Sequence, residues 1–156
     1  MKWVLEGKNY LYVLFGIGIL VYFNSFFGQF VWDDLIYFVN NPEIHSFNLF
    51  KLFGENIFNK ATYYRPIPAT YFSLLLNIFG GQTFFYHLIQ VVIHIINSIL
   101  VFKLFSLFFN KKPSFFLSLI FLVHPMNVES VSYIAASARL YLHDLFQVHL
   151  PFSRYP

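Results

Sequence analysis

Cysteine is absent from the 156-residue chain. Without thiols the protein can form neither a disulfide framework nor a thiolate metal site, so any metal ligands must be carboxylates or imidazoles. Charge is also scarce, because Asp, Glu, Lys and Arg make up 11% of the residues, against about 25% in an ordinary soluble domain. The basic residues are scattered, and no cluster exceeds Lys111-Lys112. This pattern excludes nucleic-acid binding as the function.

Apolar residues are correspondingly frequent. Hydrophobic residues make up 58% of the chain and aromatic residues 23%, and the mean hydropathy is +0.59. A deviation of this kind is typical of a membrane protein. We therefore predict an all-α integral, multi-pass membrane protein, with about three transmembrane helices and with interfacial or re-entrant helices in a large extracytoplasmic loop.

The order of polar and apolar stretches predicts the segments of this protein. They are a cytoplasmic N-terminus at 1–8, a transmembrane helix at 9–29, an extracytoplasmic loop with interfacial helices at 30–82, and a second transmembrane helix at 83–109. A cytoplasmic turn at 110–113, a short or broken third span with an external segment at 114–138, and a truncated or divergent tail at 139–156 follow. The orientation rests on the positive-inside tendency of Lys2, Lys8, Lys111 and Lys112.

Two adjacent carboxylates, Asp33 and Asp34, stand where the first apolar run ends at Trp32. Tryptophan is common at the membrane–water boundary, so the pair is expected at the membrane surface. Mutual repulsion and poor solvation there favour proton uptake by at least one of them, which makes the pair our lead candidate for acid–base chemistry. Alternatively, Asp33 caps a short helix that runs to Asn40.

Two further sets of residues are candidates for a functional role: a stripe of polar side chains on one helix and an acid–imidazole pair. His87, Gln90, His94 and Asn97 follow at spacings of three, four and three, which places them on one face of a helix. That face either hydrogen-bonds to neighbouring helices or has a direct substrate or proton role. His124 and Glu129 either line a pocket, hold a divalent cation together with the aspartates, or form a helix-end hydrogen-bond network.

Three blocks of residues follow one another along the chain. The first block is Trp32-Asp33-Asp34 with Asn40-Asn41-Pro42. The second is Tyr64-Arg65-Pro66 followed by Tyr71, Leu76-Asn77, Gly80, His87, His94 and Asn97, and the third is His124-Pro125, Glu129 and Ser137-Ala138-Arg139. In this order the blocks resemble the amino-terminal part of the multispanning, lipid-linked-sugar glycosyltransferases of the C superfold, in particular their tetratricopeptide-associated, O-mannosyltransferase-like branch.

This resemblance implies transfer of a sugar from a polyprenyl-phosphate donor to an acceptor hydroxyl of a protein or glycan. Transfer would occur on the extracytoplasmic side and with inversion, in a bacterial inner membrane or in the endoplasmic reticulum of a eukaryote. Asp34, or else Asp33, would act as the catalytic base. Arg65 and Arg139 would bind the leaving phosphate, because a guanidinium meets phosphate oxygens in a bidentate way. The resemblance identifies no cofactor with certainty, and it leaves open whether a divalent cation takes part.

Two other functions remain open from the sequence. One is a membrane scaffold without activity, since the later spans of a family member are absent from this sequence and we do not expect the chain alone to transfer sugar. The other is a transporter fragment that uses the His87/His94 stripe as a polar pathway. The position of Asp33 and Asp34 outside the apolar runs argues against transport, because transport sites usually lie near the midplane of the membrane.

Overall fold

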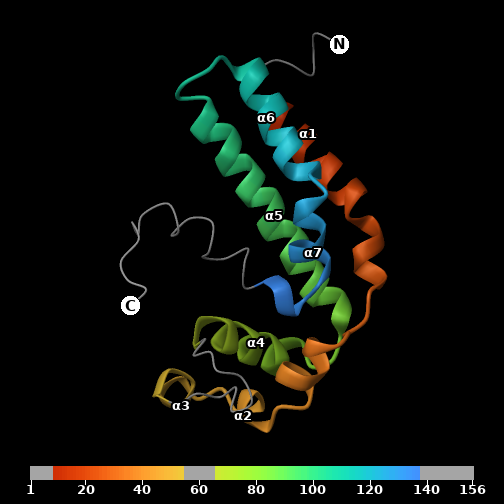
Figure 1. The fold of residues 1–156 in the computed structure, drawn as a ribbon, viewed down its shortest axis with the longest axis vertical. Helices are drawn as coiled ribbons and strands as arrows, with labels where there is room; N and C mark the ends of the chain where they lie inside the picture. The colour runs from red at the N-terminus through yellow and green to blue at the C-terminus, as the bar shows by residue number, and fades with distance from the viewer. Residues whose placement is uncertain (1–8, 55–65, 138–156) are drawn as a thin grey trace, which may run out of the picture. The chain divides into compact units, whose positions relative to one another are not determined.

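The computed structural model describes residues 9–54 and 66–137. Every regular element in this part of the chain is a helix, which agrees with the all-α prediction. The elements are α1 (Asn9–Val21), η2 (Phe23–Phe27), η3 (Asp34–Val39), α2 (Pro42–His45), α3 (Leu49–Gly54), α4 (Pro66–Phe79), α5 (Thr83–Phe105), α6 (Lys111–Val123), α7 (Met126–Ser132) and η4 (Ala135–Ser137) (Figure 1). They form two compact units, and the described residues of unit 1 are 9–28 and 87–137, whereas those of unit 2 are 29–54 and 66–86.

Unit 1 is built around a core shared by α1, α5 and α6, which run side by side (Figure 1). Tyr10 of α1 is a buried aromatic residue of this core, and its ring centroid lies 5.5 Å from that of Phe102 on α5 and 5.1 Å from that of Phe115 on α6. In the same core, Leu14, Ile95 and Leu122 are almost completely buried. Hydrophobic burial and aromatic packing therefore hold the three helices together.

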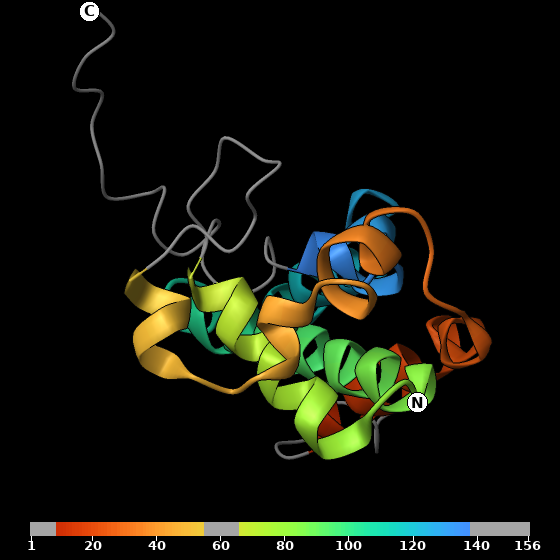
Figure 2. The same cartoon turned by 90° about the horizontal axis from the view of Figure 1, so that it is seen from below.

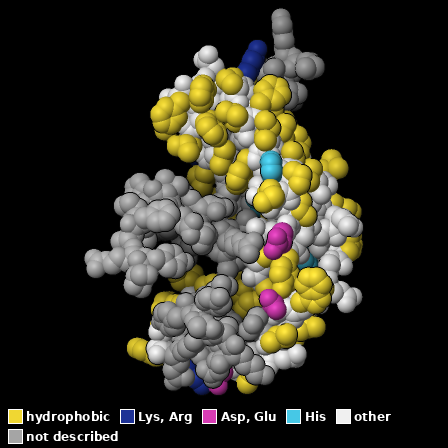
Figure 3. Space-filling view, viewed as in Figure 1, with side chains coloured by type: hydrophobic (Ala, Val, Ile, Leu, Met, Phe, Trp, Pro, Cys, Tyr) yellow, Lys and Arg dark blue, Asp and Glu magenta, His cyan; other side chains and the backbone are white. Residues whose placement is uncertain are grey.

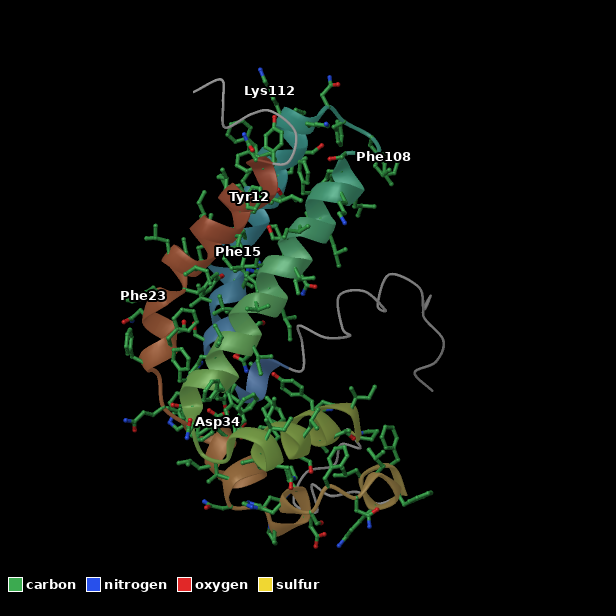
Figure 4. The ribbon with its side chains drawn as sticks, turned by 180° about the vertical axis from the view of Figure 1, so that it is seen from behind. Tyr12, Phe15, Phe23, Asp34, Phe108 and Lys112 are labelled. Atoms are coloured by element: carbon green, nitrogen blue, oxygen red, sulfur yellow. The ribbon has the colours of Figure 1, made fainter. Side chains whose placement is uncertain are left out.

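The outer surface of unit 1 is also apolar. Tyr12, Phe15 and Phe23 are exposed by 71%, 50% and 56%, and Figure 4 labels them along α1 and η2. Figure 3 shows hydrophobic side chains over much of the described surface on its viewed face, with few charged groups. A helix that is apolar on both its buried and its exposed side is typical of a membrane environment.

By length and composition, α5 can cross a bilayer. Helices α6 and α7 are long and apolar enough to do so only when they are taken together. The two helices are bent by 60° at the His124-Pro125 junction. The short or broken third span at 114–138 stays a prediction, with which this bent helix pair is compatible. Helix α1 has 13 residues and is followed by the 3₁₀-helix η2, so a continuous transmembrane helix over 9–29 stays a prediction.

At the break between α6 and α7, polar side chains bind backbone carbonyl groups that lack their usual helical donor four residues further on. Pro125 has no N–H group to offer Phe121 O, which accepts a hydrogen bond of 2.7 Å from Asn127 Nδ2 and a longer one of 3.4 Å from the His124 N–H. Leu122 O accepts from the Tyr22 hydroxyl at 3.1 Å and from His94 Nε2 at 3.0 Å. In an apolar environment such bonds are the condition for tolerating a broken helix.

Tyr22→Phe should destabilise unit 1 by about 0.6 kcal/mol and at most about 2 kcal/mol, because Leu122 O then loses one of its two donors. Unfolding of the chain in mixed micelles with increasing dodecyl sulfate, followed by circular dichroism, measures this loss. Tyr12→Phe is the matched control, since the Tyr12 side chain is 71% exposed. Equal stability of the two variants would show that the Tyr22 hydroxyl does not support the break.

Unit 2 contains η3, α2, α3 and α4, and Figure 2 shows these elements from below. Helix α4 starts at Pro66, which suits a first helical position, and it stops before Gly80, whose φ of +58° favours glycine. The buried rings of Phe38 and Phe72 stack with centroids 3.6 Å apart. This stack fixes η3, which carries Asp34, against α4.

Candidate functional site

The chain makes a tight turn at residues 31–34 before η3 begins. The Val31 backbone N–H donates to Asp34 Oδ2 at 3.0 Å, and the Asp34 N–H donates to Val31 O at 3.0 Å. Asp34 has no exposed surface (Figure 4). These two bonds across the turn orient the Asp34 carboxylate.

Trp32 sits in this turn with a backbone φ of +45°. Left-handed conformations are strained for L-residues with bulky side chains, and they persist only where the surroundings impose them. The indole gains little burial in return, because it is 81% exposed. The hydrogen bonds between Val31 and Asp34 span the strained residue and hold it in place.

η3 itself is a π-helix, identified by the Asn40 N–H bond of 2.9 Å to Leu35 O, five residues earlier. π-Helical turns are rare and frequently occur at functional sites. A strained residue, a buried carboxylate and a π-helix therefore follow one another within residues 32–39. No local sequence pattern predicts this combination, although the Trp32-Asp33-Asp34 block marks its position.

Asp33 occupies the position before η3, but its side chain makes no capping hydrogen bond. The alternative prediction that Asp33 caps this helix is therefore wrong. The reason lies in its backbone, because Asp33 already has helical angles (φ −63°, ψ −27°), whereas a capping residue usually has extended ones. Asp33 is exposed where Asp34 is buried, so the two neighbouring acids lie in different environments.

Within unit 1, the polar stripe of α5 is buried and bonds mainly to backbone carbonyl groups. Gln90 Nε2 donates to Ile134 O at 3.3 Å, and His94 Nε2 donates to Leu122 O. Because a carbonyl oxygen only accepts, this bond places the His94 ring proton on Nε2. Ser98, which the sequence pattern did not single out, donates to Ser118 O at 2.9 Å. Asn97 is half-buried. These contacts are the interhelical hydrogen bonds expected as one alternative for the stripe.

His87 differs from the rest of the stripe. It is 2% exposed, and among the described residues neither ring nitrogen has a hydrogen-bond partner. Its ring lies against the backbone of Gly28, where a Cβ atom would stand 2.8 Å from His87 Nε2. The glycine therefore makes room for the imidazole.

His124 and Glu129 flank the bend between α6 and α7, and both are exposed. His124 Nδ1 accepts a hydrogen bond of 3.2 Å from the Met126 N–H, as in the expected helix-end network. Within residues 9–54 and 66–137, no three His, Asp or Glu side chains lie together as metal ligands. A divalent cation thus stays a prediction without a described ligand set.

The predicted site residues fall into three groups. Asp33 and Asp34 belong to unit 2, and unit 1 contains His87, His94, Asn97, His124 and Glu129. Arg65 and Arg139 lie outside the described residues. The sequence also missed Tyr22, which is 72 residues from His94 and 100 residues from Leu122 along the chain. Only the packing of α1, α5 and α6 brings these three residues together.

Comparison with known proteins finds sequence similarity to one class of enzymes. The sequence is similar over most of its length to proteins named protein O-mannosyl-transferases, which are glycosyltransferases. The resemblance drawn from the three sequence blocks is thereby confirmed. Neither a protein-family model nor a solved structure matches the chain.

The particular relatives are animal proteins. Protein O-mannosyl-transferase TMTC3 of Homo sapiens is 29% identical over 136 residues, TMTC1 of Homo sapiens is 30% identical over 139 residues, and F38B6.6 of Caenorhabditis elegans is 28% identical over 149 residues. The matches cover 82%, 81% and 86% of this chain, but 15%, 16% and 21% of the relatives. The chain therefore spans less than a quarter of the length of these proteins.

Proposed function

We propose that this chain is part of a membrane glycosyltransferase that transfers mannose from a polyprenyl-phosphate donor to a hydroxyl group of a protein. Transfer occurs on the extracytoplasmic side and inverts the anomeric centre. The sugar and the acceptor come from the names of the relatives. The observation that carries the proposal is the turn at residues 31–34, where the Asp34 carboxylate is buried and oriented beside the exposed Asp33.

In the proposed step, Asp34 accepts the proton of the acceptor hydroxyl. The hydroxyl oxygen forms a bond to C1 of mannose while the bond between C1 and the phosphate oxygen breaks, and the lipid phosphate leaves with the electron pair. Oδ2 accepts the Val31 N–H bond, which orients the carboxylate. Catalytic hydrogen bonds often form only in the substrate complex, so burial of Asp34 is compatible with this role.

Asp33 has a supporting role in this proposal. Its exposed carboxylate makes no capping bond and increases the negative charge around Asp34, which favours proton uptake by its neighbour. Arg65 and Arg139 are proposed to bind the leaving phosphate, since fixed positive charge stabilises a developing anion. Both arginines follow from the family resemblance.

A membrane location agrees with a lipid-linked donor. Helix α5 can cross a bilayer, and α6 with α7 can form a broken span. The polar stripe of α5 argues against the transporter alternative, because Gln90, His94 and Ser98 are bonded to carbonyl groups of neighbouring segments. Side chains engaged in this way stabilise helix contacts and do not line an open pathway.

The choice of donor tests this function directly. A protein that carries this segment together with the remaining length of its relatives is reconstituted in liposomes with a serine- and threonine-containing peptide. We expect labelled mannose to move to the peptide from polyprenyl-phosphate mannose and not from a mannose nucleoside diphosphate. The product should have the anomeric configuration opposite to that of the donor, as nuclear magnetic resonance would show. Transfer from the nucleotide sugar alone would refute the proposed donor class.

A further inference from the structure

Trp32 is an unusual residue for its place in unit 2. Its backbone has a φ of +45°, and its carbonyl oxygen accepts the N–H groups of Leu35 at 3.1 Å and of Ile36 at 3.4 Å. These are tasks of the main chain, which glycine performs without the strain that a left-handed conformation causes in a bulky residue. The indole is 81% exposed, so burial does not compensate for this strain. The fold alone thus gives no reason for a tryptophan here, and strained residues of this kind cluster at ligand sites.

The neighbouring side chain narrows the choice of ligand for the indole. Asp33 is exposed as well, and it makes no capping hydrogen bond. An acyl chain packed on the indole would take water from the neighbouring carboxylate without offering a hydrogen bond in return, which is unfavourable. A phosphate group beside the indole would be repelled by the same carboxylate. A neutral, hydrated ligand with an apolar face avoids both costs.

A pyranose ring has this combination of properties. The C–H groups on its face can pack against the electron-rich face of an indole, and its hydroxyl groups keep the edge of the ring hydrated. Ligand sites commonly combine an aromatic surface with a few polar groups. The lipid of the proposed donor anchors such a ring at the membrane surface. Trp32 follows the apolar segments α1 and η2, and tryptophan is common at this level of a membrane.

Resting on the proposed function, we propose that Trp32 is the platform for the mannose ring of the polyprenyl-phosphate donor. The apolar face of the sugar packs on the indole, two residues before the proposed base Asp34. The hydrogen bonds between Val31 and Asp34 span Trp32, so one turn sets both the position of the platform and the orientation of the carboxylate. Trp32 thus binds the donor through its sugar and contacts neither the phosphate nor the lipid.

Binding of two lipids separates contact with the sugar from contact with the rest of the donor. A protein extended to the length of its relatives is placed in phosphatidylcholine nanodiscs without a peptide, and the Kd values of polyprenyl-phosphate mannose and of polyprenyl phosphate are measured. In Trp32→Gly we expect the Kd of the mannose lipid to rise by about 3–10-fold, as for the loss of one aromatic contact. The Kd of polyprenyl phosphate should be unchanged, which also shows that the variant is folded. Glycine suits the positive φ at this position.

Two further variants are the controls. Trp32→Phe keeps an aromatic face, so it should bind the mannose lipid more tightly than Trp32→Gly does. Phe50→Ala removes a ring that is 93% exposed on α3 of the same unit. This variant should bind both lipids as the original protein does.

Several results would overturn the proposal. Equal weakening of the binding of both lipids in Trp32→Gly would show that the indole supports the fold or contacts the lipid, and not the sugar. Unchanged binding of both lipids would show that the sugar does not touch the indole, and a higher KM for the peptide alone would place Trp32 in the acceptor site. If neither lipid binds to the original protein, the proposed donor class is refuted, and the inference fails with it.

Discussion

Replacing Asp34 with asparagine is expected to reduce mannose transfer by about 10²–10⁴-fold, the usual contribution of a positioned general base. Asparagine has nearly the same shape, and its side-chain oxygen can still accept the Val31 N–H bond that orients Asp34. The substitution thus removes proton acceptance and preserves the turn. Transfer from polyprenyl-phosphate mannose to a peptide, measured in a protein extended to the length of its relatives, gives the rate.

Asp33→Asn is the matched control, because the same change is made one residue earlier on an exposed side chain without a capping bond. Its effect should be smaller, since it alters only the charge beside Asp34. Binding of the lipid donor should be similar in both variants. A normal rate for Asp34→Asn would refute its role as the base. A large loss in Asp33→Asn alone would assign that role to Asp33.

Gly18→Ala should destabilise unit 1 by about 1–3 kcal/mol, the usual cost of overpacking a core. A Cβ atom at Gly18 would stand 2.5 Å from Ile95 Cγ1 and 2.8 Å from Ile95 Cδ1. Ile95 is 1% exposed, so it cannot move aside without disturbing its own neighbours. Unfolding in mixed micelles, followed by circular dichroism, should show the loss as a transition at a lower mole fraction of dodecyl sulfate.

Gly16→Ala is the control two residues earlier on the same helix. A Cβ atom there would meet nothing within 4 Å. Alanine has a higher helix propensity than glycine, by about 1 kcal/mol in a helix interior, so this variant should be as stable as the original protein or more stable. If both variants lose the same amount of stability, the close contact between Gly18 and Ile95 is not what determines the packing of α1.

Local chemistry explains where some of the helices begin and end. Helix α4 covers Pro66–Phe79, where a proline suits the start and Gly80 ends the helix through its positive φ. The break between α6 and α7 falls at His124-Pro125 because Pro125 cannot donate to the preceding turn. The position of the candidate site could also be located, since Asp33 and Asp34 follow an apolar run. In each case the residues that decide the outcome are neighbours along the chain.

The roles of individual side chains within these elements could not be predicted. Spacing along α5 grouped Asn97 with His87 and His94, yet the buried polar residue at this level is Ser98. Which residue faces inward depends on where α1 and α6 pack, and both are distant in sequence. The hydrogen-bond partner of the Tyr22 hydroxyl could not be predicted for the same reason, because Leu122 lies 100 residues away in the sequence.

By itself, the sequence determined the all-helical class of this protein, because hydropathy, proline and glycine act locally along the chain. It also determined the position of the acid pair. Only the tertiary structure decided that Asp34 is buried and Asp33 exposed, since burial depends on what packs against a side chain. The hydrogen bonds from Tyr22, His94 and Gln90 that stabilise the broken span were decided in the same way, by contacts between segments far apart in the chain.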